Sequence, residues 1–137
     1  MEVILIRLSI QSKKKEVVEF IEELKMILLD VNFDMDRDLI IIKKNKGRKQ
    51  YSTPYTLLNL EYDTSDVVER LKELTVEEYS ETFVDRDNVN PPLLFVFGKN
   101  INNELIYIKL KIKGDQTRHI LCVSFHYAEH AMIFPYA

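Results

Sequence analysis

The chain has 137 residues, of which 46% are hydrophobic and 30% are charged, and its formal net charge is −3. This length and composition predict one globular domain with its own core, and they exclude a chain that is disordered over most of its length. The acidic balance argues against a protein whose whole surface binds nucleic acid. No apolar run approaches the roughly 20 residues that span a bilayer, and residues 1–10 do not resemble a secretory signal, so we expect a cytoplasmic protein with no membrane partner.

The predicted elements begin with a strand and a helix. Residues 1–10 are compatible with a short additional strand at the N-terminus, and Ser12 is a candidate N-cap for the helix that follows. Apolar residues recur in this helix at the expected spacing, at Val17, Phe20, Ile21, Leu24, Ile27 and Leu28. An apolar run at 39–42 then predicts a strand that leads into a basic loop at 43–49.

Two more helices are predicted in the acidic middle of the chain. Thr64 or Ser65 can cap the first of them, and Thr75 opens a Thr-x-x-Glu capping box that predicts the start of the second. A polar, proline-containing loop is expected at 85–92. Residues 12–92 should therefore be mainly helical, apart from the basic loop.

The last third of the chain has the pattern of three strands, at 93–97, 105–113 and 120–126. The segments between them are Asn-rich or contain Gly-Asp, and they are short enough for antiparallel hairpins. Helices early and an antiparallel sheet late, over 93–126, indicate a single domain of the α+β class. We expect Phe134 and Tyr136 to dock the C-terminal tail at 127–137 on the core.

The strand at 105–113 alternates apolar and polar side chains almost without a break. Because side chains on a strand point to opposite sides with a period of two, each set shares one face. The apolar face carries Ile106, Ile108, Leu110 and Ile112, and the polar face carries Tyr107, Lys109, Lys111 and Lys113. Two interpretations of the polar face are open: the lysines keep a solvated face in water, or the ring and the ammonium groups bind a phosphate backbone.

A second group of cations lies in the predicted basic loop. Although the chain as a whole is acidic, local groups of cations such as these form basic surfaces that attract a phosphate backbone. The candidate RNA-binding residues are Lys111 and Lys113 of the strand, with Lys43, Lys44, Lys46 and Arg48 of the loop.

The last predicted strand ends at His126. By simple alternation, Leu121, Val123 and Phe125 share one face, and Cys122, Ser124 and His126 share the other. If this strand pairs with the one before it across Gly114, His126 lies near Tyr107 or Lys109, although the pattern leaves the register open. A histidine, a tyrosine and a lysine suit metal-free cleavage at a ribose phosphate, since they supply a base, an acid and a cation.

Other chemistry is poorly supported by the sequence. Cys122 lies inside an apolar strand pattern, which is typical of a small core residue and not of a nucleophile. His126 and His130 are four residues apart and would share a helix face near Glu129, but no Cys or His cluster supplies the remaining ligands of a metal site. We therefore predict neither a metal nor another cofactor.

Four segments resemble the MqsR family of bacterial toxins. They read Tyr55-Thr-Leu-Leu-Asn, Leu74-Thr-Val-Glu-Glu-Tyr-Ser, Val96-Phe-Gly-Lys, and Ile106-Tyr-Ile-Lys-Leu-Lys-Ile continuing to Val123-Ser-Phe-His. The resemblance covers residues 50–137 and implies a RelE-like α+β fold, an mRNA interferase activity and a cognate antitoxin, for which a small zinc-finger protein is one candidate. It places Tyr107 at the family's functional tyrosine, and His126 where shorter members carry a functional lysine.

The sequence departs from this family at two positions. Glu81 stands near the place of a lysine and Leu94 near the place of a glutamine. A carboxylate repels phosphate, and leucine has no hydrogen-bonding group in its side chain. Two hypotheses follow. The chain is a metal-independent endoribonuclease toxin that cleaves single-stranded mRNA through Tyr107, His126 and Lys109, or it is a non-catalytic protein-binding module of the same fold.

Overall fold

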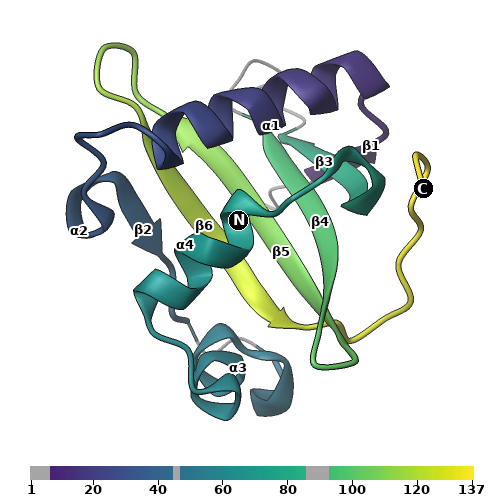
Figure 1. The fold of residues 1–137 in the computed structure, drawn as a ribbon. Helices are drawn as coiled ribbons and strands as arrows, with labels where there is room; N and C mark the ends of the chain where they lie inside the picture. Colours follow the sequence, from purple (N-terminus) through teal and green to yellow (C-terminus); the bar gives the residue numbers. More distant parts are fainter. Residues whose placement is uncertain (1–6, 45–46, 86–92) are drawn as a thin grey trace, which may run out of the picture.

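A six-stranded sheet in the order β1-β3-β4-β5-β6-β2 organises the computed structural model, which describes residues 7–44, 47–85 and 93–137 (Figure 1). The strands are β1 (Arg7–Ile10), β2 (Leu39–Ile41), β3 (Tyr79–Asp85), β4 (Leu94–Ile101), β5 (Glu104–Lys113) and β6 (His119–Tyr127). The helices are α1 (Lys14–Leu28), α2 (Met35–Asp38), α3 (Thr53–Leu60) and α4 (Thr64–Lys72), with single 3-10 turns η1 (Lys49–Tyr51) and η2 (Val76–Glu78). The α+β class predicted from the sequence is confirmed.

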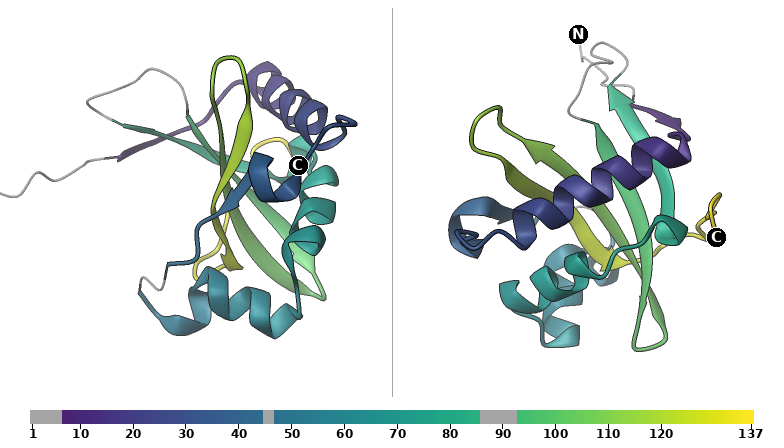
Figure 2. Two further views of the ribbon diagram at one scale, coloured as in Figure 1. Left: turned by 90° about the vertical axis from the view of Figure 1, so that its left-hand side faces the viewer. Right: turned by 45° about the horizontal axis from the view of Figure 1, so that its top comes forward.

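The two faces of the sheet have different surroundings. α1 and α4 cover one face, which we call the inner face, and no described helix lies across the opposite, outer face (Figures 1 and 2). Ile106, Ile108 and Leu110 of β5 are fully buried on the inner face. From α1, Phe20 stacks on Phe95 of β4 with ring centroids 4.1 Å apart. The predicted apolar face of β5 and the amphipathic first helix are therefore confirmed.

The sheet is mixed, not antiparallel throughout as the sequence analysis predicted. β2, the predicted strand at 39–42, lies at the edge of the sheet and runs parallel to β6, with Leu39 opposite Ile120. The other four pairings are antiparallel, and the β4–β5 hairpin turns at Asn102 and Asn103, both with positive φ. Asparagine tolerates this backbone region in tight hairpins. An apolar run predicts a strand but does not determine its partner, which explains the error.

The prediction of a helix after Thr75 is wrong. The capping box does form, because Glu78 accepts from the Thr75 N–H at 3.0 Å, but it closes only the single turn η2. The chain then extends into β3, which pairs with β4 on one side and β1 on the other. Thr82, Phe83 and Val84 favour a strand, and pairing on two sides outweighs the local capping signal. Residues 12–92 are therefore less helical than predicted.

α3 was not predicted, although its start has a clear signal. The Ser52 side chain caps the helix by accepting from the Tyr55 N–H, and Pro54 lies in the first turn, where its missing N–H costs nothing. α3 covers the part of β6 that β2 leaves without a neighbour. The hydroxyls of Thr53 and Thr56 accept the N–H groups of Phe125 and Tyr127, each at 3.0 Å. Hydrogen bonds to α3 thus replace the missing strand neighbour at this end of β6.

The C-terminal tail returns along the outer face of β4. Gly98 makes room for it: a Cβ atom there would lie 2.7 Å from the Phe134 ring and 3.0 Å from the Met132 sulfur. Further along, the Tyr136 ring stacks on the Tyr79 ring with centroids 5.8 Å apart, and the Tyr136 hydroxyl donates to the Ser12 carbonyl at 2.5 Å. The expected docking of the tail is confirmed.

Some sequence predictions lie outside the described residues. These are the first part of the N-terminal strand, Lys46 of the basic loop, and nearly all of the loop at 85–92. Within the described ranges, every helix is too short or too polar to cross a bilayer.

We expect Gly98→Ala to lower the free energy of unfolding by about 1–3 kcal/mol, because the new methyl group collides with the docked tail. Phe134→Ala removes the ring that it meets. In the Phe134→Ala background, Gly98→Ala should lower the free energy of unfolding much less. The collision is removed there, and alanine also reduces the conformational freedom of the unfolded chain, which favours folding. Urea denaturation of the four variants measures this coupling. Equal costs in both backgrounds would show that the tail does not pack on Gly98.

Candidate functional site

A bulge in β6 decides which side chains reach the outer face. Lys109 lies opposite Ser124, but the next residue of β5, Leu110, lies opposite Cys122, so Val123 is an extra residue in β6. An extra residue reverses the alternation of the strand. Cys122 and Phe125 are accordingly both buried in the core. The predicted set of Cys122, Ser124 and His126 on one face is therefore wrong.

The bulge places His126 directly across from Tyr107 on the outer face. The two rings stack with centroids 5.1 Å apart and planes within 15°. Lys109 follows on the same face, with its ammonium 5.9 Å from the Tyr107 ring centroid and 5.4 Å from that of Phe83. The three side chains named from sequence as candidate catalytic residues thus come together, and their catalytic roles remain a prediction.

The imidazole of His126 is held in one orientation. Its Nδ1 lies 2.9 Å from the Tyr127 carbonyl oxygen, and because a carbonyl can only accept, Nδ1 must carry the proton. In the neutral ring Nε2 then has a lone pair. Burial lowers the pKa of His126 below its ordinary 6.5, and the Lys109 ammonium lowers this pKa further. The Tyr127 carbonyl and Glu129 have the opposite effect but do not outweigh them. A neutral His126 near pH 7 is equipped to accept a proton.

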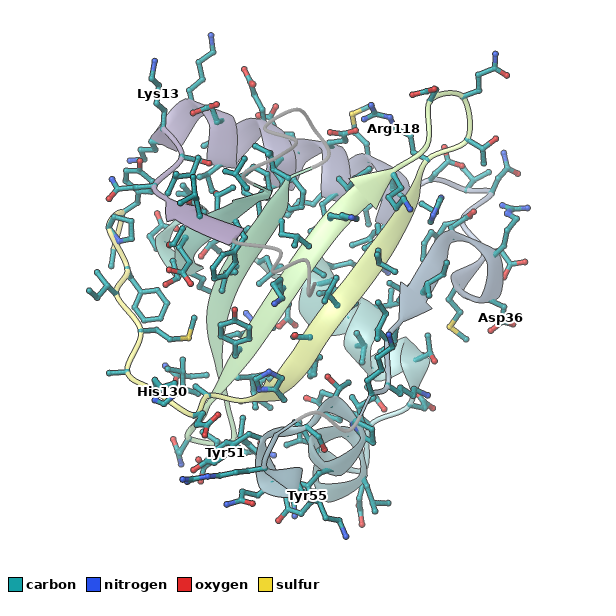
Figure 3. The ribbon with its side chains drawn as sticks, turned by 180° about the vertical axis from the view of Figure 1, so that it is seen from behind. Lys13, Asp36, Tyr51, Tyr55, Arg118 and His130 are labelled. Carbon is teal, nitrogen blue, oxygen red and sulfur yellow. The ribbon has the colours of Figure 1, made fainter. Side chains whose placement is uncertain are left out.

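These residues line a cleft of about 650 Å³, which we call the outer cleft. Its walls come from β1, β3, β5, β6 and the tail (Figure 3). The side chains that line it are those of Ser9, Ile10, Gln11, Ser80, Glu81, Tyr107, Lys109, Ser124, His126, Glu129, His130, Ala131, Met132 and Ile133. The cleft is large enough for part of a polymer chain, and it mixes cations, carboxylates and apolar groups.

Both departures from the MqsR pattern lie on this face. Glu81 of β3 lines the outer cleft, where the Ser9 hydroxyl donates to its carboxylate at 2.7 Å. Across the sheet it shares a row with Val96 of β4 and Lys109 of β5. Leu94 is buried and lies in the next row, opposite Phe83. The cleft therefore carries a carboxylate on the wall opposite its lysine.

Most of the candidate RNA-binding residues do not reach the outer cleft. Lys111 is half-buried on β5, in the row beside Lys109, and it does not line the cleft. Lys43 and Lys44 are exposed outside it. Arg48 does not line the cleft either, but its Nε lies 3.8 Å from a carboxylate oxygen of Glu129, which does.

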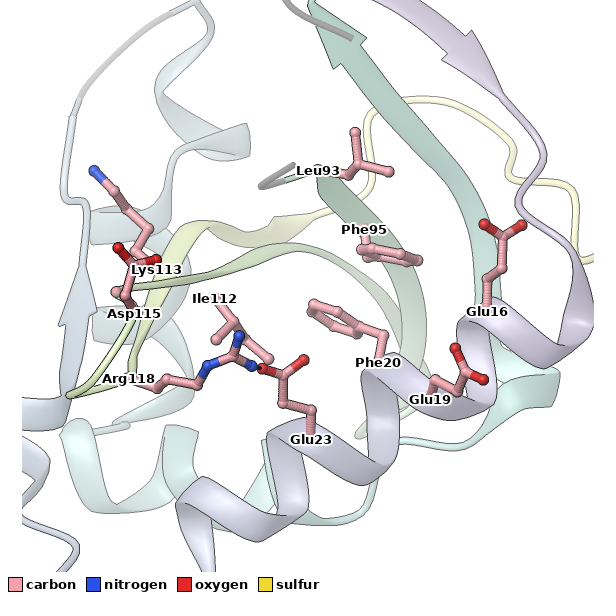
Figure 4. A pocket seen from close by; sticks show the side chains of 11 residues that line it. Glu16, Glu19, Phe20, Glu23, Leu93, Phe95, Ile112, Lys113, Asp115 and Arg118 are labelled. Atoms are coloured by element: carbon pink, nitrogen blue, oxygen red, sulfur yellow. Dashed lines mark ion pairs between the residues drawn. The ribbon is translucent and has the colours of Figure 1, made fainter. Parts of the chain in front are cut away.

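Lys113 lines a different cavity, of about 470 Å³, between α1 and the β5–β6 turn (Figure 4). Glu16, Glu19 and Glu23 form its wall on α1, and Arg118 is paired with Glu23. With Asp115, four carboxylates against one paired arginine and one lysine make this cavity unfavourable for phosphate. The RNA-binding candidates that the structure describes are therefore not gathered on one surface.

Cys122 is a core residue, as predicted. It is fully buried, and burial raises the pKa of its thiol to about 12. His126, Glu129 and His130 all line the outer cleft, but the chain after Tyr127 is not helical and does not present the two histidines on one helix face. Among the described residues, no group of three or more His, Cys, Asp or Glu side chains is placed to hold a metal ion.

The sequence predicted that the tail docks on the core, but not that it lines the outer cleft. Glu129, His130 and Met132 enter it only because the chain turns back over Gly98, a contact between segments far apart in the chain. Comparison of the chain with protein-family models, curated proteins and solved structures finds no match.

We expect stability to depend on pH through His126. The pKa of His126 is lowered in the folded state. The stability that its neutral imidazole contributes is therefore fully present above pH 6.5, and it is lost as the pH falls through the lower folded-state pKa. Wild type should therefore lose more stability than His126→Gln between about pH 7.5 and about pH 5, as measured by urea denaturation. In Lys109→Met, NMR titration should give a higher pKa for His126. An unchanged pKa would contradict the proximity of the two charges.

Proposed function

We propose that this protein is a metal-independent endoribonuclease with a RelE-like fold, which cleaves single-stranded mRNA at the outer cleft. The observation that carries the proposal is the stacked pair of Tyr107 and His126, with Nδ1 of His126 committed to a carbonyl and Lys109 beside both rings. General base, general acid and cation are the groups that cleavage next to a ribose 2′-hydroxyl needs.

The reaction has one bond-forming and one bond-breaking event. Nε2 of His126 takes the proton of the 2′-hydroxyl, and the 2′-oxygen bonds to the adjacent phosphorus. The bond from phosphorus to the 5′-oxygen of the next nucleotide breaks, and Tyr107 gives its proton to that oxygen. The Lys109 ammonium stabilises the charge on the non-bridging oxygens. The products are a 2′,3′-cyclic phosphate and a 5′-hydroxyl, and no metal ion takes part.

The resemblance to the MqsR family supports the same activity, because it assigns a functional role to the position of Tyr107. It also supports a cognate antitoxin as partner. A ribonuclease whose cleft lies on a sheet face that no described helix covers would act on any accessible mRNA, so a protein that covers this face is a reasonable form of control. The acidic chain as a whole makes a basic antitoxin surface the better match.

Purified protein should cleave a long mRNA in EDTA and leave 2′,3′-cyclic phosphate ends. His126→Gln and Tyr107→Phe should each lower the single-turnover rate by about 10²–10⁴-fold, the usual contribution of a general acid or base. Lys109→Met should also be strongly impaired. Gel mapping of end-labelled products and single-turnover kinetics measure these effects.

Matched controls separate catalysis from folding. His119→Gln changes the histidine at the other end of β6, and Lys113→Met changes the lysine at the end of β5, both outside the outer cleft. Both should cut like wild type. A substrate with deoxyribose at the mapped position should resist cleavage. If His126→Gln, Tyr107→Phe and Lys109→Met all cut like wild type, the activity does not arise from this cleft.

The second candidate function is a non-catalytic protein-binding module. It is favoured by Glu81, whose carboxylate faces the cleft where the family pattern has a lysine, and by the apolar Leu94 in the neighbouring row. A phosphate backbone loses affinity beside a carboxylate, whereas a basic protein surface gains it.

We expect Glu81→Gln to strengthen binding of uncleavable 2′-O-methyl RNA severalfold at low salt, because it removes a negative charge from the cleft and keeps an acceptor for Ser9. The gain should shrink as salt rises. Glu77→Gln makes the same change on an exposed position outside the cleft and should have little effect. Fluorescence anisotropy measures both. Absence of RNA binding by wild type and by Glu81→Gln would favour the protein-binding module.

A further inference from the structure

A second cleft, of about 520 Å³, continues from the outer cleft around the end of β6. The two share Glu129, His130 and Ala131 as lining residues, so a ligand can pass from one to the other without leaving the surface. Three tyrosines line the second cleft, Tyr51 of η1, Tyr55 of α3 and Tyr127 of β6. We call it the tyrosine cleft. Figure 3 shows Tyr51 and Tyr55 close together just beyond His130.

The three tyrosines of this cleft are half-exposed, and two of them, Tyr55 and Tyr127, are held by the surrounding structure. The Tyr55 and Tyr127 rings meet edge to face, with centroids 6.4 Å apart. The Tyr127 hydroxyl donates to Asn59 at 2.5 Å, and its backbone N–H donates to Thr56. These contacts tie the end of β6 to α3. Rings that are already ordered lose little freedom when they stack on a ligand.

Polar groups surround these rings. Gln50 lines the cleft and offers both a donor and an acceptor, while Glu104 offers an acceptor. Arg48 pairs with Glu129 at the boundary between the two clefts, and this pairing offsets the negative charge that a passing backbone would meet. Aromatic faces with donors and acceptors at their rim suit flat heteroaromatic rings with polar edges.

We propose that the tyrosine cleft binds the bases of single-stranded RNA next to the phosphate held in the outer cleft. This inference rests on the proposed ribonuclease function and extends it, because it makes the substrate a strand of several nucleotides. Stacking on tyrosine tolerates any base, since every base has a π face. Gln50 adds a hydrogen-bonding group that can favour some bases over others.

The test compares substrates that reach one cleft or both. A dinucleotide spans only the cut phosphate, whereas a longer RNA with the same cut site also extends over the tyrosine cleft. For the longer RNA, Tyr51→Leu and Tyr55→Leu should each lower kcat/KM by about tenfold, mainly through KM. For the dinucleotide they should change nothing. Leu58→Ala, an exposed change on α3 outside both clefts, should leave both substrates unaffected.

Two kinetic outcomes would overturn the inference while leaving the ribonuclease proposal intact. One is full activity of both tyrosine variants on the longer RNA. The other is an equal loss on the two substrates, which would mean that the tyrosines only support the structure of the outer cleft.

A crosslinking experiment separates this inference from the ribonuclease proposal. A 2′-O-methyl RNA cannot be cut, and 4-thiouridine at successive positions of it crosslinks to side chains that contact the base. Mass spectrometry should find the crosslinks in peptides that contain Tyr51 or Tyr55, and Leu substitution should abolish them. This result would support base binding even if wild type cut nothing. Crosslinks confined to other surfaces, or their complete absence, would overturn it.

Discussion

The site depends on one extra residue in β6, the strand that pairs with β5. Cys122 and Phe125 are separated by an odd number of positions, so a regular strand would send one of them to the core and the other to solvent. The bulge at Val123 lets both be buried, and it thereby sends His126 to the outer face, across from Tyr107. Two threonines of α3 then hold the strand beyond the bulge. Burial of apolar side chains in the core thus positions the pair that we propose as acid and base.

Charges of both signs surround Tyr107 and His126 in the outer cleft. Burial and, to a smaller extent, the Lys109 ammonium lower the pKa of His126 and favour a neutral imidazole, while the Tyr127 carbonyl and Glu129 oppose them. Glu81 places a second carboxylate in the same cleft, so affinity for a phosphate backbone is reduced on one wall and supported on the other. This balance fits a substrate bound largely by stacking and shape, with few phosphate contacts. It also explains why a binding module and a ribonuclease are both compatible with the same face.

The sequence predicted what local patterns can encode. The alternation in β5, the amphipathic α1, the turn at Asn102 and the core position of Cys122 all follow from neighbouring residues, and the structure confirms them. Long-range pairing defeated the rest. β3 forms where a capping box predicted a helix, because strands on both sides outweigh one turn of local bonding. The tail reaches the outer cleft because it packs over Gly98, which has no side chain. The bulge changes which face of the sheet the side chains of β6 point to. Neither feature leaves a periodic signal.

The most direct test of the proposed site is a crystal structure of the protein with an RNA that carries a 2′-O-methyl group at the cut position. We predict a phosphate within hydrogen-bonding distance of the Lys109 ammonium, the blocked 2′-oxygen facing Nε2 of His126, and the Tyr107 hydroxyl near the 5′-oxygen. RNA bound to another face, or RNA whose ribose lies away from His126 while the phosphate contacts other cations, would contradict the assignment of this cleft as a ribonuclease site.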